Sequence, residues 1–288
     1  MDWINAVVQG ILVGGLYALF ATGLSLIFGI MRLVNIAHGD LIVLASFLGL
    51  VIVTGLGLYP LVALLIVVPL MFALGYALQR GLHNFTHGTD IQPPLLVTYG
   101  LSINNQNALL EIFSADSQKL PAGPLQTASM QIAEGLAVGV FPVIVFACAV
   151  VVIAGLQLLL YRTALGAAFR ATSDDPDTAR LMGIDNRHIF ALAMAISLAV
   201  VALAGVFLGM RTAFDPSIGP GRLIYAFEAV IIGGLGSLWG TLVGGIVLGV
   251  SQIIGGKLFP GADQLAGHVV FLIILVFRPR GLFPRAMD

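Results

Sequence analysis

The chain alternates long apolar runs with short polar stretches. A helix that crosses a membrane needs about 20 mainly apolar residues. Runs of this length, or close to it, cover residues 4–28, 41–58, 61–78, 93–113, 138–161, 188–210 and 266–277. The hydrophobic pattern therefore predicts a series of membrane-spanning helices.

A glycine-rich apolar run over residues 222–254 is too long for one crossing and contains GGLGSLWG in its middle. It predicts a short segment, 222–236, then a turn and a full span, 238–254. At 1.5 Å per residue the short segment covers only about 22 Å, less than the bilayer core of about 30 Å. Discontinuous helices of this kind are typical of transporter cores. Alternatively, 222–236 only dips into the membrane, which would leave the C-terminus outside.

Composition agrees with a chain that is solvated by lipid. Hydrophobic residues make up 59% of the 288 residues and charged residues 9%, whereas a soluble domain carries about 25% charged residues. Mean hydropathy is +1.03. The expected fold is all-α, a polytopic transmembrane helix bundle of eight or nine membrane segments. We expect one transmembrane domain over residues 1–288, with a cytoplasmic loop at 162–187.

Several function classes are excluded by what the sequence lacks. The net charge is −1 and no basic run offers a nucleic-acid footprint. No HExxH, CxxC or GxSxG motif is present, and no GxxxxGK[ST] loop that could hold nucleotide phosphates. The lone Cys148 cannot form an internal disulfide. We therefore expect no catalytic site, no metal and no cofactor in this chain.

The distribution of Lys and Arg predicts the orientation, because cytoplasmic loops carry an excess of both. The loop 162–187 and the C-terminal tail are rich in arginine, and placing both inside puts the N-terminus and the loop 114–137 outside. The basic residues expected inside are Arg32, Arg80, Arg162, Arg170, Arg180, Arg187, Arg278, Arg280 and Arg285. Those expected outside are Lys119, Arg211, Arg222 and Lys257.

The second half of the cytoplasmic loop predicts a short helix with both ends marked. Asp175 is a good N-cap, Pro176 suits the first helical position, and Gly183 suits a left-handed C-terminal cap. So short a helix needs support, so it is either a loop packed on its own membrane domain or a docking helix for a cytoplasmic protein. Its expected exposed apolar residues are Ala179, Leu181, Met182 and Ile184.

Glycines at four-residue spacing predict tight helix packing, since small residues let backbones approach closely in lipid. The pattern occurs near the N-terminus and in the glycine-rich run. The candidate packing residues are Gly10, Gly14, Gly233, Gly234, Gly236, Gly240, Gly244, Gly245 and Gly249. Such packing is shared by many membrane proteins and indicates no particular function.

Polar groups at predicted membrane depth usually face a cavity or one another. The candidate pathway residues are Asn35, His38, Asp40, Asn104, Asn107 and Glu228. Asn104 and Asn107 share a helix face, while Asn105 is expected to meet a neighbouring helix. The amides could equally pin helices together, and the first three residues could form an interfacial cap. Glu228 is expected to pair with Arg222 or a partner subunit's residue, or to face water.

Four sequence blocks resemble the permeases of branched-chain amino acid ABC transporters. They are GGLYALFATGLSLIFGIMRLVNIAHGDLIVLASF, AAFRATSDDPDTARLMGID, AFEAVIIGGLGSLWGTLVGGIVLG and RPRGLFP, in the order found in that family. The short N-terminus resembles the smaller of the two permeases that such systems usually encode.

The resemblance implies an importer of several subunits in the bacterial inner membrane. A second, homologous permease would complete the pathway, two cytoplasmic ATPase subunits would bind ATP and magnesium, and a periplasmic substrate-binding protein would deliver the cargo. The segment 163–184 would couple the bundle to the ATPase. The residues implied in coupling are Thr163, Gly166, Arg170, Asp175, Ala179, Leu181, Met182, Gly183 and Ile184.

Three functions compete at this point. The first is the permease subunit of an ATP-driven importer for branched-chain or related amino acids. The second is a stand-alone secondary transporter or channel for a small polar solute such as urea or an amide. The third, an intramembrane enzyme, is disfavoured by the missing catalytic motifs. The capped cytoplasmic helix favours the first.

Overall fold

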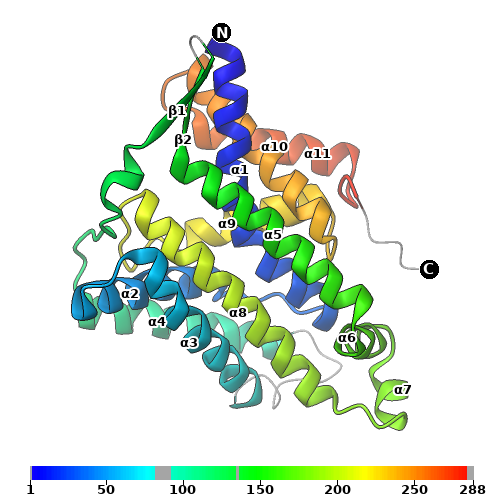
Figure 1. Cartoon of the computed structure of the whole chain (residues 1–288). Helices are drawn as coiled ribbons and strands as arrows, with labels where there is room; N and C mark the ends of the chain where they lie inside the picture. Colours follow the sequence, from blue (N-terminus) through cyan, green and yellow to red (C-terminus); the bar gives the residue numbers. More distant parts are fainter. Residues whose placement is uncertain (1, 82–91, 134–135, 284–288) are drawn as a thin grey trace.

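The computed structural model describes residues 2–81, 92–133 and 136–283, which are mostly helical (Figure 1). The helices are α1 (Asp2–Met31), α2 (His38–Leu56), α3 (Pro60–Gly81), α4 (Gln92–Phe113), α5 (Val140–Arg162), α6 (Ala164–Asp174), α7 (Pro176–Leu181), α8 (Asn186–Arg211), α9 (Gly219–Gly233), α10 (Leu238–Leu258) and α11 (Asp263–Phe277). A 3₁₀ turn, η2 (Gly123–Gln126), and an antiparallel hairpin of β1 (Ser129–Ala133) and β2 (Leu136–Gly139) lie between α4 and α5. Every predicted span corresponds to one helix, which confirms the all-α bundle.

Six described helices are long and apolar enough to cross a membrane, so the chain is a multi-pass membrane protein. They are α1, α2, α3, α5, α8 and α10. The other predicted segments differ in kind, because α4 carries four consecutive amide residues and α9 and α11 have only 15 residues each. The predicted break in the glycine-rich run is present between α9 and α10. It falls three residues earlier than expected because Gly234, with φ +107°, cannot continue the helix.

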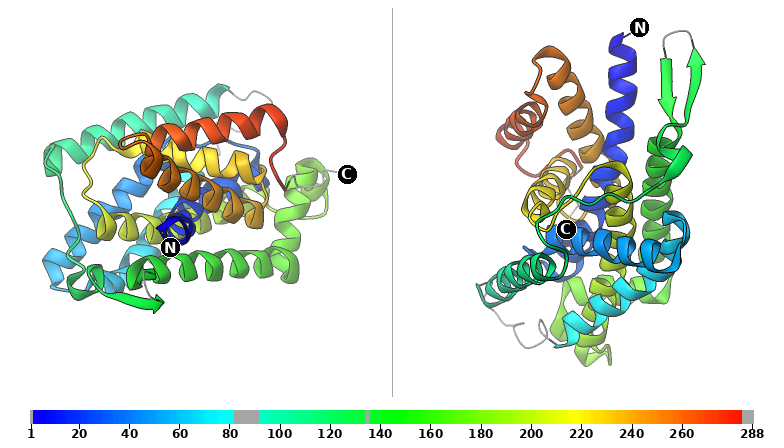
Figure 2. Two further views of the ribbon diagram at one scale, coloured as in Figure 1. Left: turned by 90° about the horizontal axis from the view of Figure 1, so that it is seen from above. Right: turned by 90° about the vertical axis from the view of Figure 1, so that its left-hand side faces the viewer.

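Helix α1 runs through the middle of the bundle (Figure 2). It is apolar all round, as expected for a helix surrounded by protein, and Ala18, Leu19, Phe20 and Ala21 have no exposed surface. Helices α5, α8, α9 and α10 pack around it. This helix is therefore the core against which the rest of the bundle is positioned.

Glycines bring α1 and α10 into backbone contact. A Cβ added at Gly10 or Gly14 would lie 2.5 Å from a backbone Cα of α10. A Cβ added at Gly245 or Gly249 would lie 2.6 or 2.4 Å from a carbonyl oxygen of α1. Any side chain at these positions would separate the two helices, since backbone atoms cannot move aside.

The remaining candidate glycines divide between packing and a turn. Gly233, Gly240 and Gly244 lie where α9 and α10 touch, and a Cβ at any of them would meet a backbone oxygen within 2.3 Å. Gly234 and Gly236 lie in the turn between the two helices with φ +107° and +77°. Their positive φ angles are what the turn requires.

The end of the bundle that carries the N-terminus has more structure than the sequence predicts. The loop expected at 114–137 forms the hairpin, which extends beside the start of α1 in the right-hand view of Figure 2. Gln118 pairs with Phe214 in an isolated β-bridge, and the Tyr59 hydroxyl donates to the Ala122 carbonyl at 2.8 Å. The Lys257 ammonium lies 4.6 Å from the Trp3 ring. The N-terminus, the hairpin and the end of α10 thus share one end of the molecule.

Candidate coupling segment and polar clusters

Helix α6 begins at Thr163, whose hydroxyl accepts the Gly166 amide at 3.0 Å. Gly166 lies against the end of α5, where an added Cβ would meet backbone oxygens of α5. Phe169 is fully buried beneath the helix. Arg170 donates to the Leu160 carbonyl, and its guanidinium lies 5.2 Å from the Tyr161 ring. Of the residues implied in coupling, Gly166 and Arg170 therefore face this chain's own α5.

Helix α7 has the two ends that the sequence predicts. The Asp175 carboxylate accepts the amides of Asp177 and Thr178 at 3.1 Å each and the Thr178 hydroxyl at 2.5 Å. The hydrogen bonds from Thr178 hold the pKa of the Asp175 carboxyl below its ordinary value. Gly183 has φ +87° and follows the helix, and the Ile184 amide donates to the Ala179 carbonyl at 3.1 Å. This is the left-handed helix end expected at Gly183.

Two of the four apolar residues expected to be exposed on α7 are indeed exposed. Leu181 is 86% and Met182 is 79% exposed. The expectation is wrong for Ala179, which is 4% exposed, and Ile184 is half-buried against the core. The reason is the reversal at Gly183, which returns the chain along the inner side of α7. Asn186 then donates to the Pro176 carbonyl at 2.6 Å.

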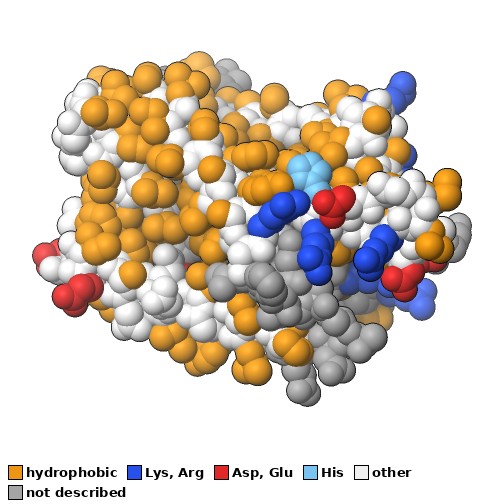
Figure 3. Space-filling view, turned by 90° about the horizontal axis from the view of Figure 1, so that it is seen from below, with side chains coloured by type: hydrophobic (Ala, Val, Ile, Leu, Met, Phe, Trp, Pro, Cys, Tyr) orange, Lys and Arg blue, Asp and Glu red, His pale blue; other side chains and the backbone are white. Residues whose placement is uncertain are grey.

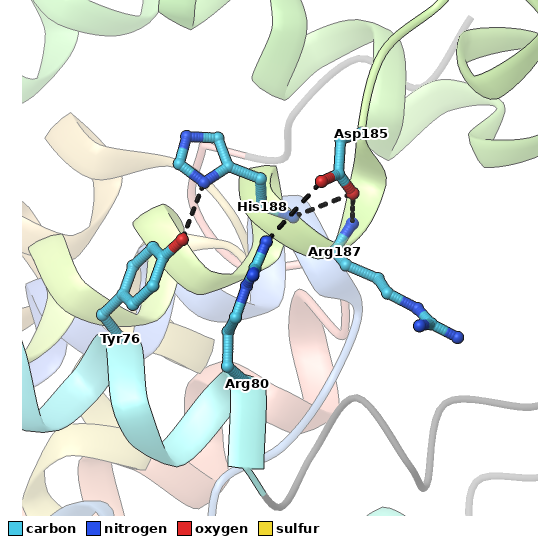
Figure 4. A network of polar contacts seen from close by, with 5 residues as sticks. All are labelled: Tyr76, Arg80, Asp185, Arg187 and His188. Atoms are coloured by element: carbon cyan, nitrogen blue, oxygen red, sulfur yellow. Dashed lines mark hydrogen bonds and ion pairs between the residues drawn. The ribbon is translucent and has the colours of Figure 1, made fainter.

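A polar network fixes the exit of this segment to α3 and α8 (Figure 4). Asp185 caps α8 by accepting the amides of Arg187 and His188 at 3.0 and 3.3 Å. Its other oxygen lies 3.6 Å from an Arg80 guanidinium nitrogen. The Tyr76 hydroxyl is 2.9 Å from Nδ1 of His188. The α6–α7 segment, residues 163–184, is therefore tied to the bundle at both ends.

A cavity of about 700 Å³ opens beside α6. It is lined by the ends of α1 and α5, by α6 and by the α9–α10 turn, and its lining includes Arg32, Tyr161, Asp174 and Trp239. The Ser173 hydroxyl donates to the Gly29 carbonyl at 2.8 Å and closes α6 against α1. The α6–α7 segment therefore shares one end of the bundle with the α9–α10 turn.

The C-terminal tail returns to the same end. The amides of Leu282 and Phe283 donate to the carbonyls of Ile232 and Gly233 at 2.8 and 3.0 Å. They satisfy acceptors that the end of α9 would otherwise leave open. Seen from the lower side of Figure 1, basic side chains gather at the α6–α7 end, whereas much of the remaining face is hydrophobic (Figure 3). The predicted cytoplasmic loop and tail thus lie together.

Asp40 is the centre of a buried cluster that joins α2 to α4. Its carboxylate, 2% exposed, accepts the Ser102 hydroxyl at 2.5 Å and the Gln106 amide at 2.9 Å. The Asn105 amide donates to the Asp40 carbonyl at 2.8 Å. Asn105 therefore contacts a neighbouring helix, α2, as the sequence predicts. An added Cβ at Gly219 would overlap the Asp40 carboxylate, so the start of α9 also abuts this cluster.

Asn35 and His38 place the start of α2 inside the bundle. The Asn35 side chain accepts the Ala37 amide at 3.0 Å, and Nε2 of His38 lies 2.7 Å from the Phe20 carbonyl. Phe20 precedes the end of α1 at Met31 by eleven residues, or about 16 Å of helix. The chain between α1 and α2 therefore folds back into the bundle, and these residues are buried within protein.

Asn104 and Asn107 lie on the exposed side of α4. Within the described residues, Asn107 donates only to the Ile103 carbonyl of its own helix, at 2.9 Å. The inward side of α4 is formed instead by Ser102, Asn105 and Gln106. At the membrane depth that the sequence predicts for α4, an exposed amide requires another protein surface or water rather than lipid.

Glu228 pairs with a residue that sequence reasoning missed. Its Oε1 lies 2.5 Å from Nδ1 of His268 on α11. Pairing with Arg222, one of the alternatives expected for Glu228, is not formed; the Arg222 guanidinium carbon lies 5.9 Å from the Tyr225 ring centroid. His268 and Glu228 are 40 residues apart, and no local pattern in the sequence connects them.

The fold and these sites define a multi-pass membrane protein with buried polar clusters in an apolar core and a structured segment docked at its basic end. The family model described as "Branched-chain amino acid transport system / permease component" matches residues 6–278. The chain belongs to this family, which confirms the family resemblance, and the match covers the first three of the four sequence blocks.

Two permease relatives agree with this assignment. The chain is 32% identical to the high-affinity branched-chain amino acid transport system permease protein BraD of Pseudomonas aeruginosa, over 98% of this chain and 96% of that one. It is 26% identical to LivH of Escherichia coli, a permease protein of the same description, over 96% and 94%. Among solved structures, PsaBC from Streptococcus pneumoniae in complex with Fab aligns with a TM-score of 0.47 and 17% identity, over 96% of this chain and 91% of that chain.

Proposed function

We propose that this chain is a permease subunit of an ATP-driven importer for branched-chain amino acids in the bacterial inner membrane. The family match and the full-length permease relatives support this function. A stand-alone transporter or channel has no comparable support. As a membrane subunit without a nucleotide-binding loop, the chain takes its energy from another protein, and ATP and magnesium bind to two partner ATPase subunits.

The observation that carries the mechanism is the α6–α7 segment. It is capped at both ends, held on the bundle, and presents Leu181 and Met182 outward. Two large, exposed apolar side chains at the basic end of the bundle favour a docking contact. In the proposed cycle, closure of the ATPase pair pushes on Leu181 and Met182. The push passes through Thr163 to α5 and through Asp185 to α3 and α8.

The proposed translocation pathway lies between this chain and a second permease. Helices α4 and α11 run along the same side of the molecule in both views of Figure 2. That side exposes Asn104, Asn107 and part of His268, which are polar groups that lipid does not solvate. We place the second permease against this side, and a periplasmic binding protein against the opposite end from α7, where the hairpin lies.

Co-purification tests this assignment. The chain, tagged and expressed with its neighbouring genes, should bring down an ATPase and a second permease in mild detergent. Amino-acid uptake by the purified complex in vesicles should require ATP and a loaded binding protein. Uptake by this chain alone, without any ATPase subunit, would instead establish the stand-alone transporter.

A further inference from the structure

One oxygen of the Glu228 carboxylate has no hydrogen-bond partner among the described residues. Its Oε1 is taken by His268, but Oε2 is buried and accepts no hydrogen bond from any described residue. The side chain is 5% exposed, whereas that of His268 is 38% exposed. A buried carboxylate oxygen without a donor is costly. A hydrogen-bond donor that arrives from the exposed side of His268 would satisfy it.

An aromatic pair adjoins the Glu228 carboxylate, because its partner His268 stacks on Tyr225. Tyr225, one turn before Glu228 on α9, is 7% exposed and stacks on His268 with ring centroids 6.2 Å apart and an interplanar angle of 16°. Aromatic faces attract cations. A carboxylate oxygen next to an aromatic face is a combination that recognises an ammonium group.

Arg222 supplies a positive charge on the same side of α9. Its Cζ lies 5.9 Å from the Tyr225 ring centroid, and its Nε is buried with no hydrogen-bond partner in the described part of the chain. Tyr225 lies three residues from both Arg222 and Glu228 and neighbours each of them on the helix surface, whereas Arg222 and Glu228 are about 120° apart around the helix. Arg222 and Glu228 carry opposite charges on the two sides of Tyr225 and form no ion pair with each other.

Arg222 and Glu228 place opposite charges on the two sides of Tyr225, with their backbones about 9 Å apart along the helix axis. An amino acid carries an α-ammonium and an α-carboxylate, and each can form a charge-assisted hydrogen bond with one of these side chains. Leu265 and Leu272, 63% and 54% exposed, flank His268 on α11 and offer an apolar surface to an aliphatic side chain.

We infer that Arg222, Tyr225, Glu228 and His268 form a binding site for the zwitterionic head group of an amino acid on its way through the permease. Oε2 of Glu228 accepts from the ammonium group, and Arg222 donates to the carboxylate. The choice of an amino acid as the ligand rests on the proposed function. The site itself rests on the arrangement of the four side chains.

Saturation-transfer NMR on the purified complex in nanodiscs, without binding protein, tests the site. Three probes are compared, namely leucine, 3-methylbutylamine, which lacks the carboxylate, and 4-methylpentanoate, which lacks the ammonium. Glu228→Gln should weaken leucine and the amine about tenfold or more, since hydrogen bonds to charged groups are the strong ones, and should leave the acid unchanged. Arg222→Gln should weaken leucine and the acid and leave the amine unchanged.

This crossed pattern separates recognition from damage to the fold, because a misfolded variant loses both analogues together. Asp116→Asn, which removes a carboxylate in the exposed loop after α4, is the matched control and should bind all three probes as wild type does. The inference is overturned if Glu228→Gln binds leucine normally, or if either variant weakens both analogues together. It is also overturned if sodium ions displace leucine as effectively as 3-methylbutylamine does, or if wild type shows no saturable leucine binding. ATP-dependent uptake by wild type in any of these cases leaves the proposed function standing, whereas absence of ATP-dependent uptake by wild type removes it.

Discussion

Replacing Leu181 and Met182 together by aspartate should abolish amino-acid uptake while the chain remains inserted and folded. Both side chains are almost fully exposed, so the change costs this chain little by itself. In the proposed complex they are buried against the ATPase, where an aspartate must lose its hydration. Hot-spot residues of an interface each contribute about 2 kcal/mol or more, so if Leu181 and Met182 are such residues, uptake should fall by more than tenfold. Uptake and ATP hydrolysis are measured on the same vesicles.

The control keeps the apolar surface and changes only its shape. Leu181→Met combined with Met182→Leu should retain most of the uptake and the stimulation of ATP hydrolysis by loaded binding protein. The aspartate pair should lose both. Normal uptake by the aspartate pair would show that α7 is not the docking element.

Gly245→Leu should prevent the bundle from reaching a stable fold. A Cβ at this position would lie 2.6 Å from the Gly14 carbonyl oxygen and 2.8 Å from the Ala18 amide nitrogen. Both are backbone atoms at the contact of α1 with α10, so the two helices must separate. Overpacking of cores costs about 1–3 kcal/mol even where side chains can adjust, and here we expect about 3 kcal/mol or more. The loss of stability is measured by heating the protein in detergent and quantifying the remaining folded protein by size-exclusion chromatography.

Gly155→Leu is the matched control for this prediction. Gly155 also lies in a membrane-spanning helix, α5, but an added Cβ would meet nothing within 4 Å. This variant should unfold within a few degrees of wild type. Equal loss of folded protein in the two variants would mean that the α1–α10 contact is not specially tight.

The parts of the fold that the sequence predicts are those with local causes. Apolar runs predict the spans, because a lipid-embedded helix must be apolar over its whole length. The ends of α7 are predicted by Asp175, Pro176 and Gly183, each of which acts within one turn of the backbone. Helix α6 escaped prediction because it is short and mixed in composition. Its signal is present in the buried residues Gly166, Phe169 and Thr172, spaced by three, after the N-cap at Thr163.

The polar clusters show what local patterns leave open. Helical periodicity correctly places Asn104 and Asn107 on one face of α4, but it does not say which face points inward. The inward face is decided by Asp40, which is 62 residues from Ser102 and 66 from Gln106. Likewise, the pairing of Glu228 with His268 depends on how α11 packs on α9. Such contacts follow from the tertiary arrangement of the helices.

The side of the membrane on which the α6–α7 segment lies tests the account most directly. Arg180→Cys on α7 and Gln131→Cys on the hairpin, both at exposed positions, are made in a chain whose native thiol is removed by Cys148→Ser. A membrane-impermeant maleimide is then added to intact spheroplasts and to opened membranes. We predict that the thiol at 131 reacts in intact spheroplasts and that the thiol at 180 reacts only after the membrane is opened. Reaction of the thiol at 180 in intact spheroplasts would contradict the proposed mechanism, because no ATPase could then reach Leu181 and Met182.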